Sequence, residues 1–324
     1  MEENTEQRVD LTLFSEKIQE LKDRIASVIV GQEQTVDLVL TAILANGHVL
    51  IEGVPGVAKT LLARLTARLI DADFSRVQFT PDLMPSDVLG TTVFNMKTNG
   101  FDFHQGPIFA DIVLVDEINR APAKTQAALF EVMEERQISI DGTTHRMGDL
   151  YTILATQNPV EQEGTYKLPE AQLDRFLMKI TMDYPSLEEE VNILERHHTN
   201  AALVKLDDIT PAITKEELLS LRAFMNQVFV DRTLLQYIAL IVQQTRTSKA
   251  VYLGASPRAS VAMLQSSKAY ALLQGRDFVT PEDIKFVAPY VLQHRLILTA
   301  EAEMEGYSPV SYTHLRAHET LRHL

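Results

Sequence analysis

The chain has 324 residues, 45% of them hydrophobic and 23% charged, and a formal net charge of −14. This composition predicts a globular protein of two domains, and the absence of cysteine excludes disulfides, thiolate metal sites and thiol nucleophiles. The acidic balance disfavours nucleic acid as a partner, because binding to it depends on cations that neutralise phosphates. Residues 1–10 are polar and no apolar run reaches membrane-spanning length, so we expect a cytoplasmic protein without a transmembrane segment.

The first half of the sequence alternates short β-branched runs with stretches of helical periodicity. This is the pattern of buried parallel strands joined by crossover helices. Strands are expected at residues 49–51, 76–79, 112–115, 152–155 and 176–180. The sequence therefore predicts an α/β fold with a parallel five-stranded sheet between layers of helices.

A glycine-rich turn between the first expected strand and the next helix has the context of a phosphate-binding loop. Its residues are Gly53, Val54, Pro55, Gly56, Val57, Ala58, Lys59 and Thr60. In such a loop Lys59 would reach the β- and γ-phosphates of ATP, and the Thr60 hydroxyl would hold Mg²⁺. Ala58 stands where glycine is usual, which is tolerable if this residue has helical dihedral angles. The alternative is a structural turn that binds no ligand. If residues 53–60 are a phosphate-binding loop, the fold is an αβα P-loop NTPase core.

Two short hairpins are expected to interrupt this alternation. Residues 91–94 and 101–104 flank a turn at 97–100, and residues 138–140 and 143–145 flank Asp141-Gly142. We interpret both hairpins as insertions into the αβ layer. Edge decoration without a function is the alternative interpretation.

An acidic pair, Asp116 and Glu117, follows the apolar strand at residues 112–115. Ligands of parallel sheets bind at the carboxyl ends of the strands, so the pair is expected beside the glycine-rich loop. There Asp116 would coordinate Mg²⁺ through water, and Glu117 would polarise the attacking water as a general base. A solvated acidic pair that opens a helix is the alternative.

An amide follows the next expected strand, in the segment ATQNP that contains Asn158. At the same edge of the sheet, Asn158 can bond both the γ-phosphate and the attacking water. An Asn-Pro turn after a strand is a common alternative. The order of loop, acidic pair and amide on successive strands favours a nucleotide site.

Beyond Tyr184 the strand pattern fades and helix starts become readable. Thr214 with Glu217 has the pattern of a capping box, and Thr280 followed by Pro281 starts a helix with one apolar stripe. We therefore predict an αβα domain at residues 1–184 and an all-α domain at residues 185–309.

Residues 310–324 shift in composition to histidine and arginine and are interpreted as a non-native tail. His314 and His318 lie one helical turn apart, but no third ligand accompanies them. A metal site is therefore not expected there.

Several separated segments resemble the MoxR group of AAA+ ATPases and occur in the order of that family. They are DEINRAPAKTQAALFEVMEE at residues 116–135, ATQNP at 155–159 and LPEAQLDRF at 168–176. The resemblance covers the chain up to about Ser308. It implies a nucleotide domain with a helical lid, ATP and Mg²⁺ as cofactors, and homo-oligomeric rings, commonly hexamers. The hairpins resemble the insertions of the wider helix-2-insert clade, which includes magnesium chelatase and MCM-type helicases.

The resemblance also implies a site completed by a neighbouring subunit. Arg175 matches the arginine finger that reaches the γ-phosphate bound by a neighbour and stabilises charge in the transition state. An ion pair with Asp174 or Glu170 is the alternative. Arg120 is a weaker second candidate for a contact between subunits.

Two further residues are assigned by the same resemblance. Arg258 follows Ser256-Pro257 and matches the second sensor, which couples the lid to the state of the nucleotide. A cation in the first turn of a helix opposes the helix dipole and needs a compensating anion, either the γ-phosphate or an ordinary surface partner. Gly31, within residues 28–32, matches the segment beside the adenine.

The function implied is ATP hydrolysis that drives chaperone-like remodelling or maturation of a partner protein. The family often works with a protein that carries a von Willebrand factor A domain, and such a partner could recruit this chain to a membrane. The alternatives are a DNA-associated motor of the MCM or magnesium-chelatase branch and a nucleotide-switched binding module. The hairpins contain few cationic residues, which argues against the DNA-associated motor. The expected general base Glu117 is present, which argues against the nucleotide-switched binding module.

Overall fold

Five parallel strands form one sheet in the order β2-β5-β8-β1-β9. The computed structural model describes residues 11–159, 165–166, 168–199 and 209–310, so His314 and His318 lie outside it. The strands are β1 (Val49–Gly53), β2 (Phe74–Gln78), β5 (Ile112–Asp116), β8 (Thr152–Gln157) and β9 (Met178–Met182). The predicted parallel five-stranded sheet is confirmed.

The strands end together, which gives the sheet two distinct edges. Val115 pairs with Ala155 on β8, and Ala155 pairs with Leu50 on β1. We call the end of the strands near Gly53 and Asp116 the carboxyl edge, and the opposite end the amino edge. A five-residue strand separates the two edges by on the order of 15 Å.

Helices cover the sheet because its central strands are buried on both faces. The helices of this part are α1 (Leu11–Val28), α2 (Glu33–Leu44), α3 (Lys59–Leu69), α4 (Pro85–Leu89), α5 (Ala123–Glu135), α6 (Glu170–Leu173) and α7 (Leu187–His198), with the 3-10 helices η1 (Pro107–Phe109) and η2 (Ile118–Arg120). A capping box of Ser186 and Glu189 starts α7.

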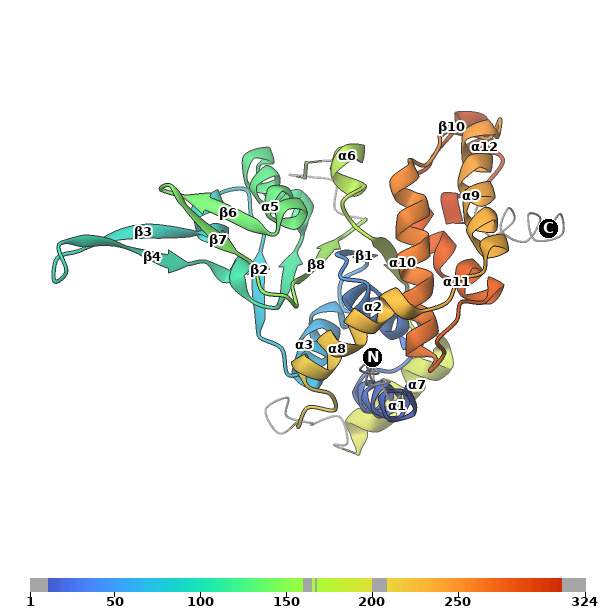
Figure 1. Ribbon diagram of the computed structural model, residues 1–324, viewed down its shortest axis with the longest axis horizontal. Helices are drawn as coiled ribbons and strands as arrows, with labels where there is room; N and C mark the ends of the chain where they lie inside the picture. The colour runs from blue at the N-terminus through green and yellow to red at the C-terminus, as the bar shows by residue number, and fades with distance from the viewer. Residues whose placement is uncertain (1–10, 160–164, 167, 200–208, 311–324) are drawn as a thin grey trace, which may run out of the picture.

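Both predicted hairpins are present. They are β3 (Gly90–Asn95) with β4 (Gly100–Gln105), and β6 (Gln137–Ile140) with β7 (Thr143–Arg146). The β3–β4 hairpin extends far from the sheet as an arm, with β6 and β7 beside its base (Figure 1). The rings of Phe103 and His145 join the two hairpins, with centroids 4.3 Å apart.

The second half forms the helical lid. Its helices are α8 (Lys215–Phe224), α9 (Arg232–Thr247), α10 (Pro257–Leu273), α11 (Pro281–Leu292) and α12 (Ala300–Met304), with the 3-10 turn η4 (Met225–Gln227). The predicted capping box starts α8, and the predicted helix start at Thr280 begins α11, where Thr280 and Asp283 also form a capping box. A short antiparallel ribbon of β10 (Val251–Leu253) and β11 (Ile297–Leu298) adds to the helices.

The lid shares one apolar core with the nucleotide domain. Buried residues of α10 and α11 join those of α2 and β9 in a single cluster. The apolar stripe of α11, from Ile284 to Val291, lies in this core. A boundary near residue 185 stays a prediction. No helix described in the structure is both long and apolar enough to cross a membrane.

Candidate functional site

The glycine-rich loop connects β1 to the first turn of α3, where sequence reasoning expected it. Gly56 has φ +88°, and a Cβ there would meet no atom within 4 Å, so its face of the loop is open. Gly53 is required for a different reason, since a Cβ there would lie 2.7 Å from the Met182 carbonyl oxygen. The loop therefore stays close to β9 and leaves room for a ligand above Gly56.

Alanine in place of glycine at position 58 was expected to be tolerable if the residue had helical dihedral angles. Ala58 does not have such angles. It precedes α3 with φ 62° and ψ 22°, in the left-handed region. A residue with a Cβ costs about 1 to 2 kcal/mol there relative to the right-handed region. The condition of helical angles is therefore not met, and Ala58 is a strained position inside the loop.

Lys59 and Thr60 form the first turn of α3. The Lys59 ammonium donates hydrogen bonds to the carbonyl of Gly53 and, at 3.2 Å, to that of Val54. These bonds hold the cation within the curve of the loop. The helix N-terminus adds partial positive charge at the same place, so the loop suits an anion such as a polyphosphate.

Asp116 ends β5 and is buried. Its Oδ2 accepts a hydrogen bond from Nε of Arg76 at 2.6 Å, and its Oδ1 accepts one from the Thr156 hydroxyl at 3.1 Å. A buried, bonded carboxylate does not fit the alternative of a solvated acidic pair. With the Thr60 hydroxyl, it offers the oxygen ligands that Mg²⁺ prefers.

Glu117 follows with φ 55°, a left-handed angle that few non-glycine residues adopt. Its Oε2 accepts a hydrogen bond from Gln78 at 2.8 Å and pairs with Nε of Arg120 at 3.2 Å. The Thr156 hydroxyl accepts from the Glu117 backbone N–H at 3.0 Å. Arg120, a weaker candidate for an intersubunit contact, therefore has a partner within its own chain.

Asn158 lies just beyond β8 and is buried, whereas Pro159 is exposed. The register of β8 with β1 and β5 brings this amide to the carboxyl edge, near the loop and Asp116. The structure therefore gathers the predicted loop, acidic pair and amide at one edge.

A cavity of about 250 Å³ adjoins the loop. Its lining is mostly apolar and comes from the segment between α1 and α2, the loop, and α7; the residues are Val28, Ile29, Val30, Gln32, Gly56, Val57, Ala58, Leu61, Pro185, Ile193 and His197. Gly31 has φ +73°, and a Cβ there would lie 2.3 Å from the Glu189 carboxylate. The cavity suits a flat, largely apolar ring such as an adenine.

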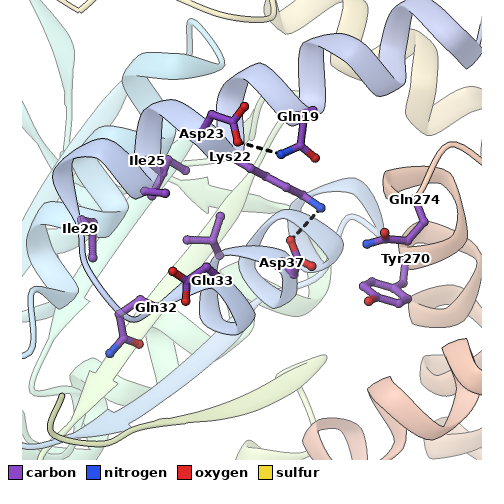
Figure 2. Close-up of a pocket in the computed structure, with 12 residues that line it drawn as sticks. Gln19, Lys22, Asp23, Ile25, Ile29, Gln32, Glu33, Asp37, Tyr270 and Gln274 are labelled. Atoms are coloured by element: carbon purple, nitrogen blue, oxygen red, sulfur yellow. Dashed lines mark hydrogen bonds and ion pairs between the residues drawn. The ribbon is translucent and has the colours of Figure 1, made fainter. Parts of the chain in front are cut away.

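A second cavity, of about 310 Å³, lies between α1, α2 and the lid helix α10 (Figure 2). It shares Ile29 and Gln32 with the first cavity. Lys22 pairs with Asp37 at 2.8 Å on one side, and Tyr270 of the lid lies on the other (Figure 2). This cavity therefore lies beside the first cavity, where α1 and α2 face the lid.

Arg175 and Arg258 lie at the amino edge, away from the loop of their own chain. Arg175 precedes β9, whose first residue pairs with the start of β1. Arg175 pairs with Oε2 of Glu134 at 3.6 Å, and Arg258 pairs with Oε1 of the same residue at 3.1 Å. The suggested partners of Arg175 were wrong, because its partner is Glu134 and Asp174 pairs with Arg295 instead.

Glu134 also supplies the anion that a cation in the first turn of α10 needs. Arg258 lies beside Arg175, so the two predicted cations share one location. Both are separated from Lys59 by the length of the sheet. Neither arginine reaches a nucleotide held by the loop of the same chain.

The two arginines line an open depression of about 540 Å³. Its charged residues are the arginines Arg136, Arg175, Arg258 and Arg295 and the carboxylates Glu134 and Asp174. Four cations and two anions give the depression a net charge of +2, on a chain whose total is −14. This local field favours an anion.

His48 lies in the wall of this depression and is buried. Its Nδ1 accepts from the Ile153 backbone N–H at 3.0 Å, and its Nε2 lies 3.2 Å from the Met133 carbonyl oxygen. A neutral ring with its proton on Nε2 satisfies both bonds. Burial, assisted by the charge of Arg136, lowers the pKa of His48 to about 3.

Two family profiles match this chain. The ATPase family associated with various cellular activities (AAA) matches residues 48–178, and the AAA lid domain matches residues 243–312. The protein named Chaperone MoxR1 of Mycobacterium tuberculosis is 45% identical over 294 residues, which cover 88% of this chain and 77% of that protein. The chain belongs to the MoxR-type AAA+ ATPases.

Other relatives agree with this membership. The protein named MoxR of Methylorubrum extorquens is 30% identical over 91% of both chains. The uncharacterized protein YeaC of Bacillus subtilis is 49% identical over 88% of both chains. A crystal structure of a protein assigned as an ATPase from Cytophaga hutchinsonii superposes with a TM-score of 0.86 at 40% identity, covering 97% of this chain and 96% of that one. Membership implies nucleotide binding and oligomeric assembly for this MoxR-type chain.

Sequence reasoning missed several polar residues of this MoxR-type site. Arg76 and Gln78 alternate along β2 and point to the acidic pair, since Gln78 is in register with Asp116. Thr156 and Glu134 both lie inside segments that carried the family resemblance. Strand alternation could have indicated Arg76 and Gln78, whereas nothing local indicated that Glu134 meets two distant arginines.

Proposed function

We propose that this protein is a Mg²⁺-dependent ATPase that works as a ring, most simply a hexamer, and remodels a partner protein. One observation carries the proposal. The residues suited to a triphosphate and its metal lie at the carboxyl edge, whereas Arg175 and Arg258 lie at the amino edge of the same sheet. A second copy that presents its amino edge to the carboxyl edge of the first would complete the site.

At the carboxyl edge, each residue has a role that follows from its position. Lys59 and the backbone of residues 53–58 bind the phosphates, and Thr60 and Asp116 hold Mg²⁺. The bound ion would neutralise charge on the β- and γ-phosphates. Glu117 accepts a proton from the attacking water, and Asn158 orients that water and the γ-phosphate.

The amino edge supplies cations to the nucleotide of the neighbour. Arg175 stabilises the charge that develops on the transferred phosphoryl group, a role worth about 10³ to 10⁵ in rate when a cation is supplied in trans. Arg258 reports the same phosphate to the lid, because it belongs to α10. The positive depression around both residues favours the approach of a polyphosphate.

The β3–β4 arm is the part of the molecule best suited to touch a client protein. Near its tip Phe94, Met96 and Phe101 are 47%, 89% and 74% exposed, and the rings of Phe94 and Phe101 lie 5.3 Å apart. Exposed aromatic and methionine side chains suit apolar protein segments. The family resemblance favours a client with a von Willebrand factor A domain, reached in the cytoplasm or at a membrane to which that client recruits the ring.

The experiment is an ATP-dependent capture of the client. Glu117→Gln should bind ATP but hydrolyse it at least about 100-fold more slowly, which holds the ring in its ATP state. Affinity-tagged Glu117→Gln protein is incubated in lysate with ATP, and bound proteins are identified by mass spectrometry. Lys59→Ala protein is the matched control that should capture nothing.

The proposal predicts a protein captured by Glu117→Gln with ATP but not with ADP, and lost when Phe94 and Phe101 are both changed to serine. Normal ATP turnover by Glu117→Gln would remove Glu117 from its role. Capture that is independent of nucleotide would contradict remodelling driven by ATP.

A further inference from the structure

The two arginines at the amino edge are joined by one carboxylate. Glu134 offers Oε1 to Nη2 of Arg258 at 3.1 Å and Oε2 to Nη1 of Arg175 at 3.6 Å. The three residues come from separate elements, since Glu134 lies near the end of α5, Arg175 precedes β9, and Arg258 opens α10. No motif in the sequence connects them.

The two arginines are held to different degrees. Nη1 of Arg175 also donates to the Phe130 carbonyl on α5, so this side chain is attached to the nucleotide domain at two points. Arg258 belongs to the lid, and its side chain is 63% exposed. Without Glu134 the lid arginine would have a like charge as its neighbour and no anion beside its helix N-terminus.

The nearby carboxylate of Asp174 is engaged elsewhere. Its Oδ1 accepts from Nε of Arg295 at 2.6 Å, and Arg295 also donates to the carbonyls of Phe176 and Leu177. Burial lowers the pKa of Arg295, and the bond to Asp174 opposes that effect. Glu134 is therefore the carboxylate that can hold Arg175 and Arg258 together.

We infer that Glu134 is a positioning residue that holds Arg175 and Arg258 together as one two-cation unit for the nucleotide bound by the neighbouring subunit. The inference rests on the proposed function. One carboxylate between two guanidinium groups offsets their repulsion and leaves a net positive charge for the phosphate. Because Glu134 belongs to the nucleotide domain and Arg258 to the lid, the same contact fixes the position of the lid when the unit is assembled.

The first test is steady-state ATP hydrolysis by Glu134→Gln, which keeps the shape of the side chain and removes its charge. We expect kcat to fall about fivefold, as the loss of exposed ion pairs implies, with KM for ATP unchanged because the loop is intact. Glu135→Gln is the matched control. Glu135 is exposed on the same helix and forms no ion pair among the residues described. Its kcat should equal that of the wild type.

The second test asks whether Glu134 acts through the arginines. In the Arg175→Ala, Arg258→Ala double variant, adding Glu134→Gln should cause no further loss of kcat. In mixed rings, Lys59→Ala subunits supply intact arginines to the ATP of Glu134→Gln subunits, so kcat per competent site should return to the wild-type level at those interfaces.

Three results would overturn the inference while leaving the proposed function standing. They are a kcat of Glu134→Gln equal to that of Glu135→Gln, a change confined to KM, and a full fivefold loss that persists in the double variant. A wild-type protein that does not hydrolyse ATP would instead remove the proposed function. The two failures are therefore distinguishable.

Discussion

The two edges of the central sheet differ in what they offer to a ligand. The carboxyl edge has an open backbone loop, one ammonium held by carbonyls, and a bonded acidic pair. The amino edge has a positive depression, and the buried, neutral His48 is one of the residues that line it. In the proposed function, the carboxyl edge binds a polyphosphate and its metal, and the amino edge supplies positive charge to the polyphosphate bound by a neighbour.

Under the proposed function, this difference means that a single chain holds only part of its site. A strand length separates Lys59 from Arg175, and no rotation of a side chain closes that distance. The proposed ring would bring the two edges of adjacent copies together. Each subunit would then contribute its carboxyl edge to one site and its amino edge to a second site.

The largest effect is expected at the carboxyl edge. Lys59→Ala should abolish nucleotide binding, because it removes the cation within the loop. Binding of a fluorescent ATP analogue measures the effect, and Lys97→Ala at the turn of the β3–β4 hairpin is a control that should bind as the wild type does. Retained binding by Lys59→Ala would refute the assignment of the loop.

At the amino edge, Arg175→Ala should keep nucleotide binding and lower kcat by about 10³-fold or more. Mixing these subunits with Lys59→Ala subunits should restore part of the activity, since each variant retains the edge that the other lacks. Activity per ring is measured after native mass spectrometry verifies the mixture. If verified mixed rings stay inactive, the edges do not act on each other in trans.

A smaller effect, on the free energy of unfolding, is expected from the protonation of His48 at the amino edge. The folded pKa of His48 is about 3, below the ordinary value of 6.5, so the unfolded state takes up a proton first as pH falls. This residue should lower the free energy of unfolding by about 1.3 kcal/mol between pH 7 and pH 5.5.

Urea unfolding at the two pH values measures this change. His48→Gln should reduce the change, because the substituted side chain takes up no proton. An unfolding midpoint that does not move between pH 7 and pH 5.5 would contradict a neutral, buried His48.

The smallest effect on the free energy of unfolding is expected from backbone strain at Ala58, at the carboxyl edge. Ala58→Gly should raise the free energy of unfolding by about 0.5 to 1 kcal/mol, because relief of the left-handed strain exceeds the entropy that glycine adds to the unfolded chain. Ala127→Gly, on an exposed turn of α5, should lower it by about 1 kcal/mol. Thermal unfolding followed by circular dichroism compares the two, and a destabilised Ala58→Gly would show that Ala58 is not strained.

Much of the carboxyl edge could be predicted because its signals are local. Gly53 to Thr60 are contiguous, and Asp116 and Asn158 each follow directly on an apolar strand. Parallel strands place such segments at one edge whatever the details of packing. The dihedral angle of Ala58 could not be predicted this way, because it depends on how the loop closes over β9.

The sequence by itself determined the five-stranded sheet, the two hairpins, the helix starts at Thr214 and Thr280, and the family, because hydrophobic period, turn residues and capping pairs act over a few neighbouring positions. The tertiary structure alone decided that Arg175 and Arg258 meet at Glu134, far from Lys59. Residues 134, 175 and 258 are distant in sequence, and the end of α5, the segment before β9 and the start of α10 meet only in the folded chain. Long-range pairing of charges leaves no periodic trace in the chain, which is why the divided site became visible only in three dimensions.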